Sequence, residues 1–102
     1  MKLGSFTFSS DGVTVTIRGL GREARLPTHW FLRSVFRILW FDFMIGQFEF
    51  YGGFGTTNDD THVYLLMLGK PKLAEKVTRE EARDFFKRAY DAYRTPGYRE
   101  LT

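Results

Sequence analysis

Eighteen aromatic side chains in a chain of 102 residues set the strongest limit on how this protein folds. They comprise eleven Phe, five Tyr and two Trp, and the chain contains no Cys. A domain of about 100 residues buries only about two-thirds of the surface that its unfolded chain exposes. We therefore expect one hydrophobic core, formed by packing alone, and several aromatic rings at the surface.

The length predicts a single compact domain over residues 1–102, because two domains would each be too small to hold a core without disulfides or metals. Hydrophobic residues make up 43% of the chain and charged residues 26%, a balance that is typical of globular proteins and argues against disorder. The absence of Cys excludes disulfides, thiolate metal sites and cysteine nucleophiles.

The sequence predicts a cytoplasmic protein that does not contact a membrane. Residues 6–9 alternate between apolar and polar side chains, unlike the apolar run of a signal peptide. The longest apolar stretch, residues 30–45, is interrupted by Arg33, Arg37 and Asp42, which are costly within a bilayer.

The alternation of apolar and polar side chains over residues 5–18 predicts a β-hairpin with its turn at Asp11 and Gly12. A short third strand is expected at residues 23–26, after the glycines that break the second strand. The chain therefore begins with antiparallel β-structure.

A helix is expected to begin near Thr28, which is a suitable N-cap residue, and to extend to about Leu39. Residues 40–45 fit either a helix or a strand. Arg33 and Arg37 share the polar face of this helix. The predicted apolar face consists of Phe31, Leu32, Val35, Phe36 and Leu39.

A second hairpin is expected in the middle of the chain, with strands at residues 47–51 and 61–68. Residues 52–60 are rich in Gly, Thr, Asn and Asp, which predicts a flexible loop between these strands. This loop would expose Phe54 at its tip.

The last element is predicted to be a helix that begins with a capping box, Thr78 followed three residues later by Glu81. The helix would end before Thr95-Pro96-Gly97, and residues 95–102 would form a C-terminal tail.

These elements predict an α+β fold, in which one small antiparallel sheet, formed by the N-terminal and central hairpins, carries two helices packed on one face. The predicted core consists of Phe8, Val15, Phe31, Val35, Leu39, Phe48, Phe50, Val63, Leu65, Phe85, Phe86 and Ala89.

Charge is unevenly distributed along a chain whose net charge is only +3. Residues 38–69 contain no Lys or Arg and four acidic residues, Asp42, Glu49, Asp59 and Asp60. The first third is basic, and its arginines would form one patch suited to phosphate or carboxylate if the helix packs beside the hairpin. The alternative is that they are scattered over the surface. These arginines are Arg18, Arg22, Arg25, Arg33 and Arg37.

No catalytic motif is present. Neither His29 nor His62 lies in a setting typical of a nucleophilic triad, and there is no Gly-x-Ser-x-Gly sequence. Asp60 and His62 would share one face of a strand, but the spacing supplies no third metal ligand. We therefore expect no enzymatic activity, no metal and no cofactor.

The aromatic surplus indicates a contact surface. Ten of the fifteen basic residues are Arg, and aromatic residues and Arg are enriched at protein interfaces. Several of the following rings are expected to be partly exposed: Trp30, Trp40, Tyr51, Phe54, Tyr64, Tyr90, Tyr93 and Tyr98. The predicted protein-binding residues are Trp30, Trp40, Tyr51, Phe54, Tyr64, Asp59 and Asp60.

The function that the sequence favours is a small non-enzymatic protein-binding module, acting as a stoichiometric inhibitor or accessory factor of the kind carried by phages and mobile elements. Its partner would be another protein or a second copy in a homodimer. The alternative is a nucleic-acid-binding protein that uses the N-terminal arginine patch. The acidic central segment argues against RNA stacking on Tyr51 and Tyr64.

Overall fold

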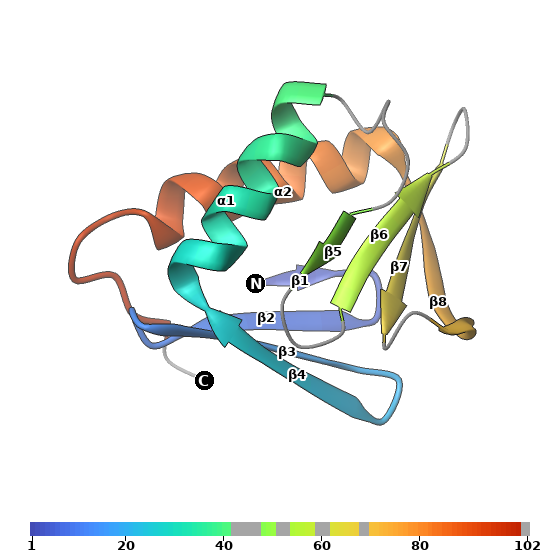
Figure 1. Ribbon diagram of the computed structural model, residues 1–102, viewed down its shortest axis with the longest axis horizontal. Helices are drawn as coiled ribbons and strands as arrows, with labels where there is room; N and C mark the ends of the chain where they lie inside the picture. The colour runs from blue at the N-terminus through green and yellow to red at the C-terminus, as the bar shows by residue number, and fades with distance from the viewer. Residues whose placement is uncertain (42–47, 51–53, 59–61, 68–69, 101–102) are drawn as a thin grey trace.

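The fold is α+β, as the sequence predicts. The computed structural model describes residues 1–41, 48–50, 54–58, 62–67 and 70–100 (Figure 1). The elements are β1 (Lys2–Leu3), β2 (Phe6–Ser10), β3 (Thr14–Gly19), β4 (Arg22–Pro27), α1 (Thr28–Phe41), β5 (Phe48–Phe50), β6 (Phe54–Asn58), β7 (His62–Met67), β8 (Lys70–Thr78) and α2 (Arg79–Tyr93).

The first sheet has the antiparallel order β1-β2-β3-β4. Its turn between β2 and β3 is closed by Asp11, whose carboxylate accepts hydrogen bonds from the backbone N–H groups of Val13 at 2.8 Å and Thr14 at 2.7 Å. Both hydrogen bonds lower the pKa of Asp11, and the one from Thr14 has the larger effect. The predicted hairpin over residues 5–18 is therefore confirmed, as is the third strand, which runs from Arg22 to Pro27.

The remaining strands form a second antiparallel sheet with the order β5-β6-β7-β8, instead of joining the first hairpin in one sheet. The division follows from the chain path, because β4 is an edge strand that ends at Pro27 and leads directly into α1. Helix α1 carries the chain away from that edge, so the central strands pair among themselves at one end of the molecule (Figure 1).

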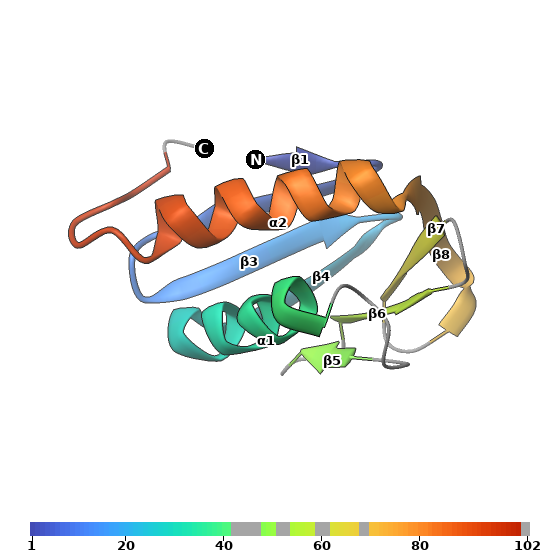
Figure 2. The ribbon, with the colours of Figure 1, turned by 90° about the horizontal axis from the view of Figure 1, so that it is seen from above.

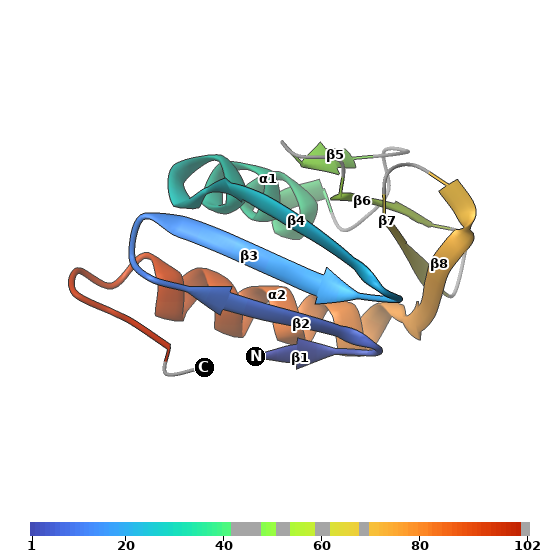
Figure 3. The ribbon, with the colours of Figure 1, turned by 90° about the horizontal axis from the view of Figure 1, so that it is seen from below.

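Both helices lie side by side over one face of the first sheet, which leaves its other face open to solvent (Figures 2 and 3). Helix α2 begins at the predicted capping box, where the Thr78 hydroxyl accepts a hydrogen bond from the backbone N–H of Glu81 at 3.1 Å. Helix α1 extends to Phe41, so residues 40 and 41 are helical, and residues 42–45 lie outside the described residues.

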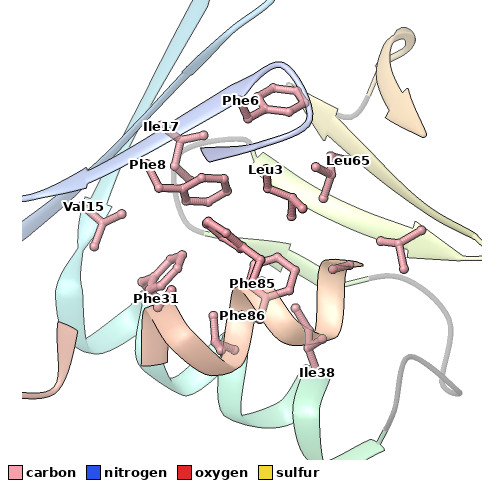
Figure 4. Close-up of a cluster of buried hydrophobic side chains, with 14 of the residues drawn as sticks. Leu3, Phe6, Phe8, Val15, Ile17, Phe31, Ile38, Leu65, Phe85 and Phe86 are labelled. Atoms are coloured by element: carbon pink, nitrogen blue, oxygen red, sulfur yellow. The ribbon is translucent and has the colours of Figure 1, made fainter. Parts of the chain in front are cut away.

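The core fills the space between the first sheet and the helices and continues to the second sheet (Figure 4). Nine of the twelve predicted core residues are buried, Leu39 is partly buried, and the side chains of Phe48 and Phe50 lie outside the described part. Nine further buried hydrophobic residues in the described part were not among those predicted from the sequence, namely Leu3, Phe6, Ile17, Ala24, Leu26, Ile38, Val77, Ala82 and Tyr93.

Three strands were not predicted: β1 at Lys2–Leu3, which pairs with β2, and strands β6 and β8. Residues 54–58 were expected within a flexible loop but form β6, because pairing on both sides with β5 and β7 overrides the low strand propensity of Gly and Asn. Strand β8 contains Pro71 and three lysines, which are tolerated because among the described strands it pairs only with β7 and forms a sheet edge.

The C-terminal tail returns to the first sheet and meets the N-terminus. The Met1 ammonium donates hydrogen bonds to the Phe8 carbonyl at 2.6 Å and to Glu100 Oε1 at 2.9 Å. The Tyr93 hydroxyl donates to Glu100 Oε2 at 3.0 Å, and the Glu100 backbone N–H donates to the Ser10 carbonyl at 3.0 Å. The described part of the tail is therefore tied to the sheet.

Tyr93 makes the stability of the protein sensitive to alkaline pH. Burial, together with the negative charge of Glu100, raises the pKa of the Tyr93 hydroxyl well above its ordinary value. The unfolded chain releases this proton near pH 10, whereas the folded protein retains it. We expect the stability to be unaffected by this group below about pH 10 and to fall as the pH rises further.

Urea unfolding of wild type and Tyr93→Phe between pH 7 and pH 11 tests this expectation. The variant should lose about 0.5–1.5 kcal/mol at pH 7, because the hydrogen bond to Glu100 is lost. Its further decline above pH 10 should be shallower than that of wild type. Parallel declines of the two proteins would contradict the role of Tyr93.

Gly19 at the end of β3 is required by close packing. A Cβ atom at this position would lie 2.5 Å from the ring of Phe6, which is fully buried, and 3.0 Å from the Ser5 carbonyl oxygen. Gly19→Ala should therefore destabilise the fold by about 1–3 kcal/mol in urea unfolding. Gly21→Asn is the control, since nothing lies within 4 Å of its Cβ position and Asn tolerates its positive φ. Equal effects of both changes would contradict this assignment.

Candidate binding surface

Helix α1 has apolar side chains on two opposite sides. Phe31, Val35 and Ile38 are fully buried, and their spacing of four and three residues places them along the inner side of the helix. The outer side is exposed and is called here the α1 outer face. It consists of Trp30, Arg33, Phe36, Arg37 and Trp40.

The rings of the α1 outer face are unusually exposed. The exposed fractions are 42% for Trp30, 50% for Phe36 and 73% for Trp40. In the part of the chain that the structure describes, only Val13 and Leu20 are comparable large apolar residues, and both lie in hairpin turns. A contiguous exposed apolar patch of this kind on a small domain is typical of an interaction site.

The side chains of the α1 outer face pack against one another. The Arg33 guanidinium lies 5.7 Å from the centroid of the Trp30 ring, in cation–π contact. The Phe36 and Trp40 rings are stacked, with centroids 6.0 Å apart and planes inclined by 16°. These contacts limit the freedom of the rings before any partner binds, which lowers the entropic cost of an interface.

Helix α2 extends this surface with Tyr90. The Tyr90 ring lies 6.2 Å from that of Phe36 and 5.2 Å from the Arg94 guanidinium. Between the two helices is a groove of about 370 Å³. It is lined by Phe36, Leu39, Trp40, Arg83, Lys87, Tyr90 and Asp91.

The surface is positively charged. Helix α1 carries Arg33 and Arg37 and no acidic residue. Among the described residues, Arg37 and Lys87 have no carboxylate within ion-pair distance. The neighbouring acids of α2 are already paired, since Asp84 contacts Arg88 at 3.1 Å and Asp91 contacts Arg94 at 3.5 Å.

The structure divides the predicted arginine patch between two layers. Arg18 and Arg25 lie on the solvent face of the first sheet, where Glu23 contacts both, at 2.6 Å and 3.2 Å. The hydrogen bond from Arg18 is the main reason why the pKa of Glu23 is lowered. Arg33 and Arg37 lie on α1, on the other side of this sheet (Figure 3). Arg22 is exposed where β4 leaves its turn.

The other predicted rings are only partly described. Tyr64 is half-buried in β7, and the Lys76 ammonium lies 5.8 Å from its ring. Tyr90 and Tyr98 are also half-buried, whereas Tyr93, another member of that set, is 4% exposed because it packs against Phe31. The predictions for Tyr51, Asp59, Asp60 and the side chain of Phe54 fall outside the described residues.

The two histidines lie in different elements of the fold. His29 is exposed at the start of α1, 5.8 Å from the Trp30 ring, and His62 begins β7. Within the described ranges, no three His, Asp or Glu side chains are grouped so that they could hold a metal ion. No described helix is both long enough and apolar enough to cross a membrane.

Trp30 and Trp40 were predicted at the surface from the sequence, whereas Phe36 was predicted on the buried side of the helix. The structure turns Phe36 outward, where it joins Trp40 and Tyr90. A helix with apolar residues around most of its circumference needs a second contact beyond its own core, and this was the signal that could have identified Phe36.

Comparisons with known proteins add no assignment to this geometry: no protein-family model matches the sequence, and neither the curated proteins nor the solved structures that were searched contain a match.

The charge of the α1 outer face can be read directly from tryptophan fluorescence, because Trp30 and Trp40 are the only two Trp residues. We expect the anion iodide to quench their emission more strongly than the cation caesium, with a difference that shrinks as ionic strength rises. Arg33→Glu with Arg37→Glu should reverse this order, and Arg22→Glu should preserve it. Equal quenching by both ions in wild type would contradict a positive surface.

Proposed function

We propose that this protein is a small non-enzymatic protein-binding module that binds its partner through the α1 outer face and Tyr90. The observation that carries this proposal is the exposure of Trp30, Phe36 and Trp40 on one helix that also carries two arginines and no acid. Trp, Phe and Arg are enriched at the centres of protein interfaces, where a few such residues supply most of the binding energy.

The arrangement of the rings favours a protein partner over a nucleic acid. Bases stack on open aromatic faces. Here Arg33 lies over the Trp30 ring, and Phe36 is stacked on Trp40, so a face of each ring is already in contact. Edges and remaining faces are well suited to apolar side chains, which pack against rings from many directions.

The charge of the surface favours a partner other than a second copy. A two-fold axis through α1 would bring Arg33 and Arg37 of one copy close to the same arginines of the other. Like charges that face each other across an interface are unfavourable. A different protein with an acidic, apolar surface avoids this repulsion, which fits a stoichiometric inhibitor or accessory factor.

Nucleic-acid binding is the second candidate, and the observation that favours it is the lack of any acidic residue on α1 beside Arg33 and Arg37. In that case affinity would fall steeply as salt rises, because phosphate contacts release counterions. Apolar protein contacts keep most of their affinity at moderate salt. The two candidates therefore give different results in the same capture experiment.

The experiment uses the immobilised protein to capture partners from a lysate of its native host, with and without nuclease treatment. The baits are wild type, Phe36→Ala with Trp40→Ala, and the control Val13→Ala, which removes a side chain that is 74% exposed in the β2–β3 turn. We expect one protein to be retained in both lysates and by the control.

The double variant should lose about 2 kcal/mol or more of binding, which is about 30-fold in affinity. Thermal unfolding of the baits checks that all three remain folded, as expected for exposed positions. A partner that is recovered only without nuclease, or that binds the double variant as well as wild type, would overturn the proposal.

A further inference from the structure

The groove between α1 and α2 has two unlike walls. On α1, Phe36 and Trp40 are four residues apart and form an aromatic ridge. On α2, Arg83 and Lys87 are also four residues apart and form a cationic ridge. Ridges with this spacing are the units with which helices interdigitate.

The bottom of the groove is closed by apolar contacts. The Phe36 ring reaches Tyr90 on the other helix, and Leu39 is packed against the core. The groove of about 370 Å³ is therefore a depression with an apolar base between two packed helices. It has room for a few apolar side chains.

Charge is polarised across the groove. Lys87 has no carboxylate partner among the described residues, and Asp91, farther along the same wall, is paired with Arg94. The α1 wall, by contrast, presents only Phe36, Leu39 and Trp40. An occupant that matches both walls is apolar on one side and acidic on the adjoining side.

We propose that this groove binds an acidic amphipathic helix of the partner protein, an inference that rests on the proposed function. Its apolar stripe packs against Phe36 and Trp40, and carboxylates on one flank pair with Lys87. Helices that bind in grooves place apolar residues at positions i, i+3, i+4 and i+7. On each wall of this groove, the two residues of the ridge are four positions apart, which is about one helical turn, so the two spacings match.

Other occupants fit the groove less well. An added β-strand needs unpaired backbone N–H and C=O groups, and both walls are helices whose backbone groups are paired internally. A second copy that docks with the same face would oppose Lys87 to its own counterpart. A single nucleic-acid strand fits the cationic wall alone.

The test uses two synthetic capped peptides that form helices. Both carry Leu at i, i+3, i+4 and i+7; one carries Glu along a flank, and the other carries Lys at the same positions. Trp emission of the protein reports binding, because Trp40 lines the groove. We expect the acidic peptide to bind at least about tenfold more tightly than the basic peptide.

Charge reversal supplies the decisive comparison. Lys87→Glu should weaken binding of the acidic peptide by about tenfold or more and strengthen binding of the basic peptide. Arg22→Glu, which makes the same change in net charge on an exposed residue of the first sheet, should change neither affinity. Trp40→Ala, followed through peptide anisotropy, should weaken binding of both peptides.

Three results would overturn the inference: no binding of the acidic peptide, equal affinity for both peptides, or no effect of Lys87→Glu. A thymidine oligomer that displaces the acidic peptide and binds more tightly would also overturn it, in favour of phosphate recognition. A captured partner that depends on Phe36 and Trp40 but not on Lys87 leaves the proposed function intact and removes only this inference. If the acidic peptide binds as expected but the lysate yields no partner, the inference that the groove binds an acidic helix is supported. In that case only the capture experiment has given a negative result.

Discussion

The packing of the Phe8 ring, in β2, against both helices is the interaction on which the rest of the structure depends. Its ring lies 4.7 Å from Phe85 and 6.4 Å from Phe86 on α2, and 6.0 Å from Phe31 on α1. One side chain of the first sheet therefore contacts both helices, and all four rings are almost completely buried. Because this cluster fixes the inner side of each helix, it also fixes which side chains remain outside.

The exposed surface is a consequence of that packing. With Phe31, Val35 and Ile38 turned toward the core, Trp30, Phe36 and Trp40 have no place inside. The side-by-side arrangement of α1 and α2 then brings Tyr90 next to Phe36 and places a cationic ridge opposite an aromatic one. The proposed function and the proposed acidic helix both depend on this juxtaposition of two segments that are far apart in the sequence.

Local signals explain which elements could be predicted. The N-terminal hairpin has strict alternation and an Asp–Gly turn, and α2 has a capping box whose hydrogen bond is present in the structure. Strands β6 and β8 lack such signals, since they contain Gly, Asn, Pro and Lys and are held by pairing with their neighbours. Of the candidate surface, Trp30 and Trp40 were foreseen, whereas Phe36, Lys87 and the groove were not.

The sequence by itself determined the α+β class, the existence of both helices and the surplus of rings over core space, because periodicity, caps and composition are local or additive properties. Only the tertiary structure decided that the strands separate into two sheets, that Arg18 and Arg25 lie in a different layer from Arg33 and Arg37, and that Phe36 faces solvent. Helix α1 is apolar around most of its circumference, so its periodicity allows several inward faces. The choice among them was made by the shape of the space between the first sheet and α2, which admits Phe31, Val35 and Ile38 and leaves the other rings outside.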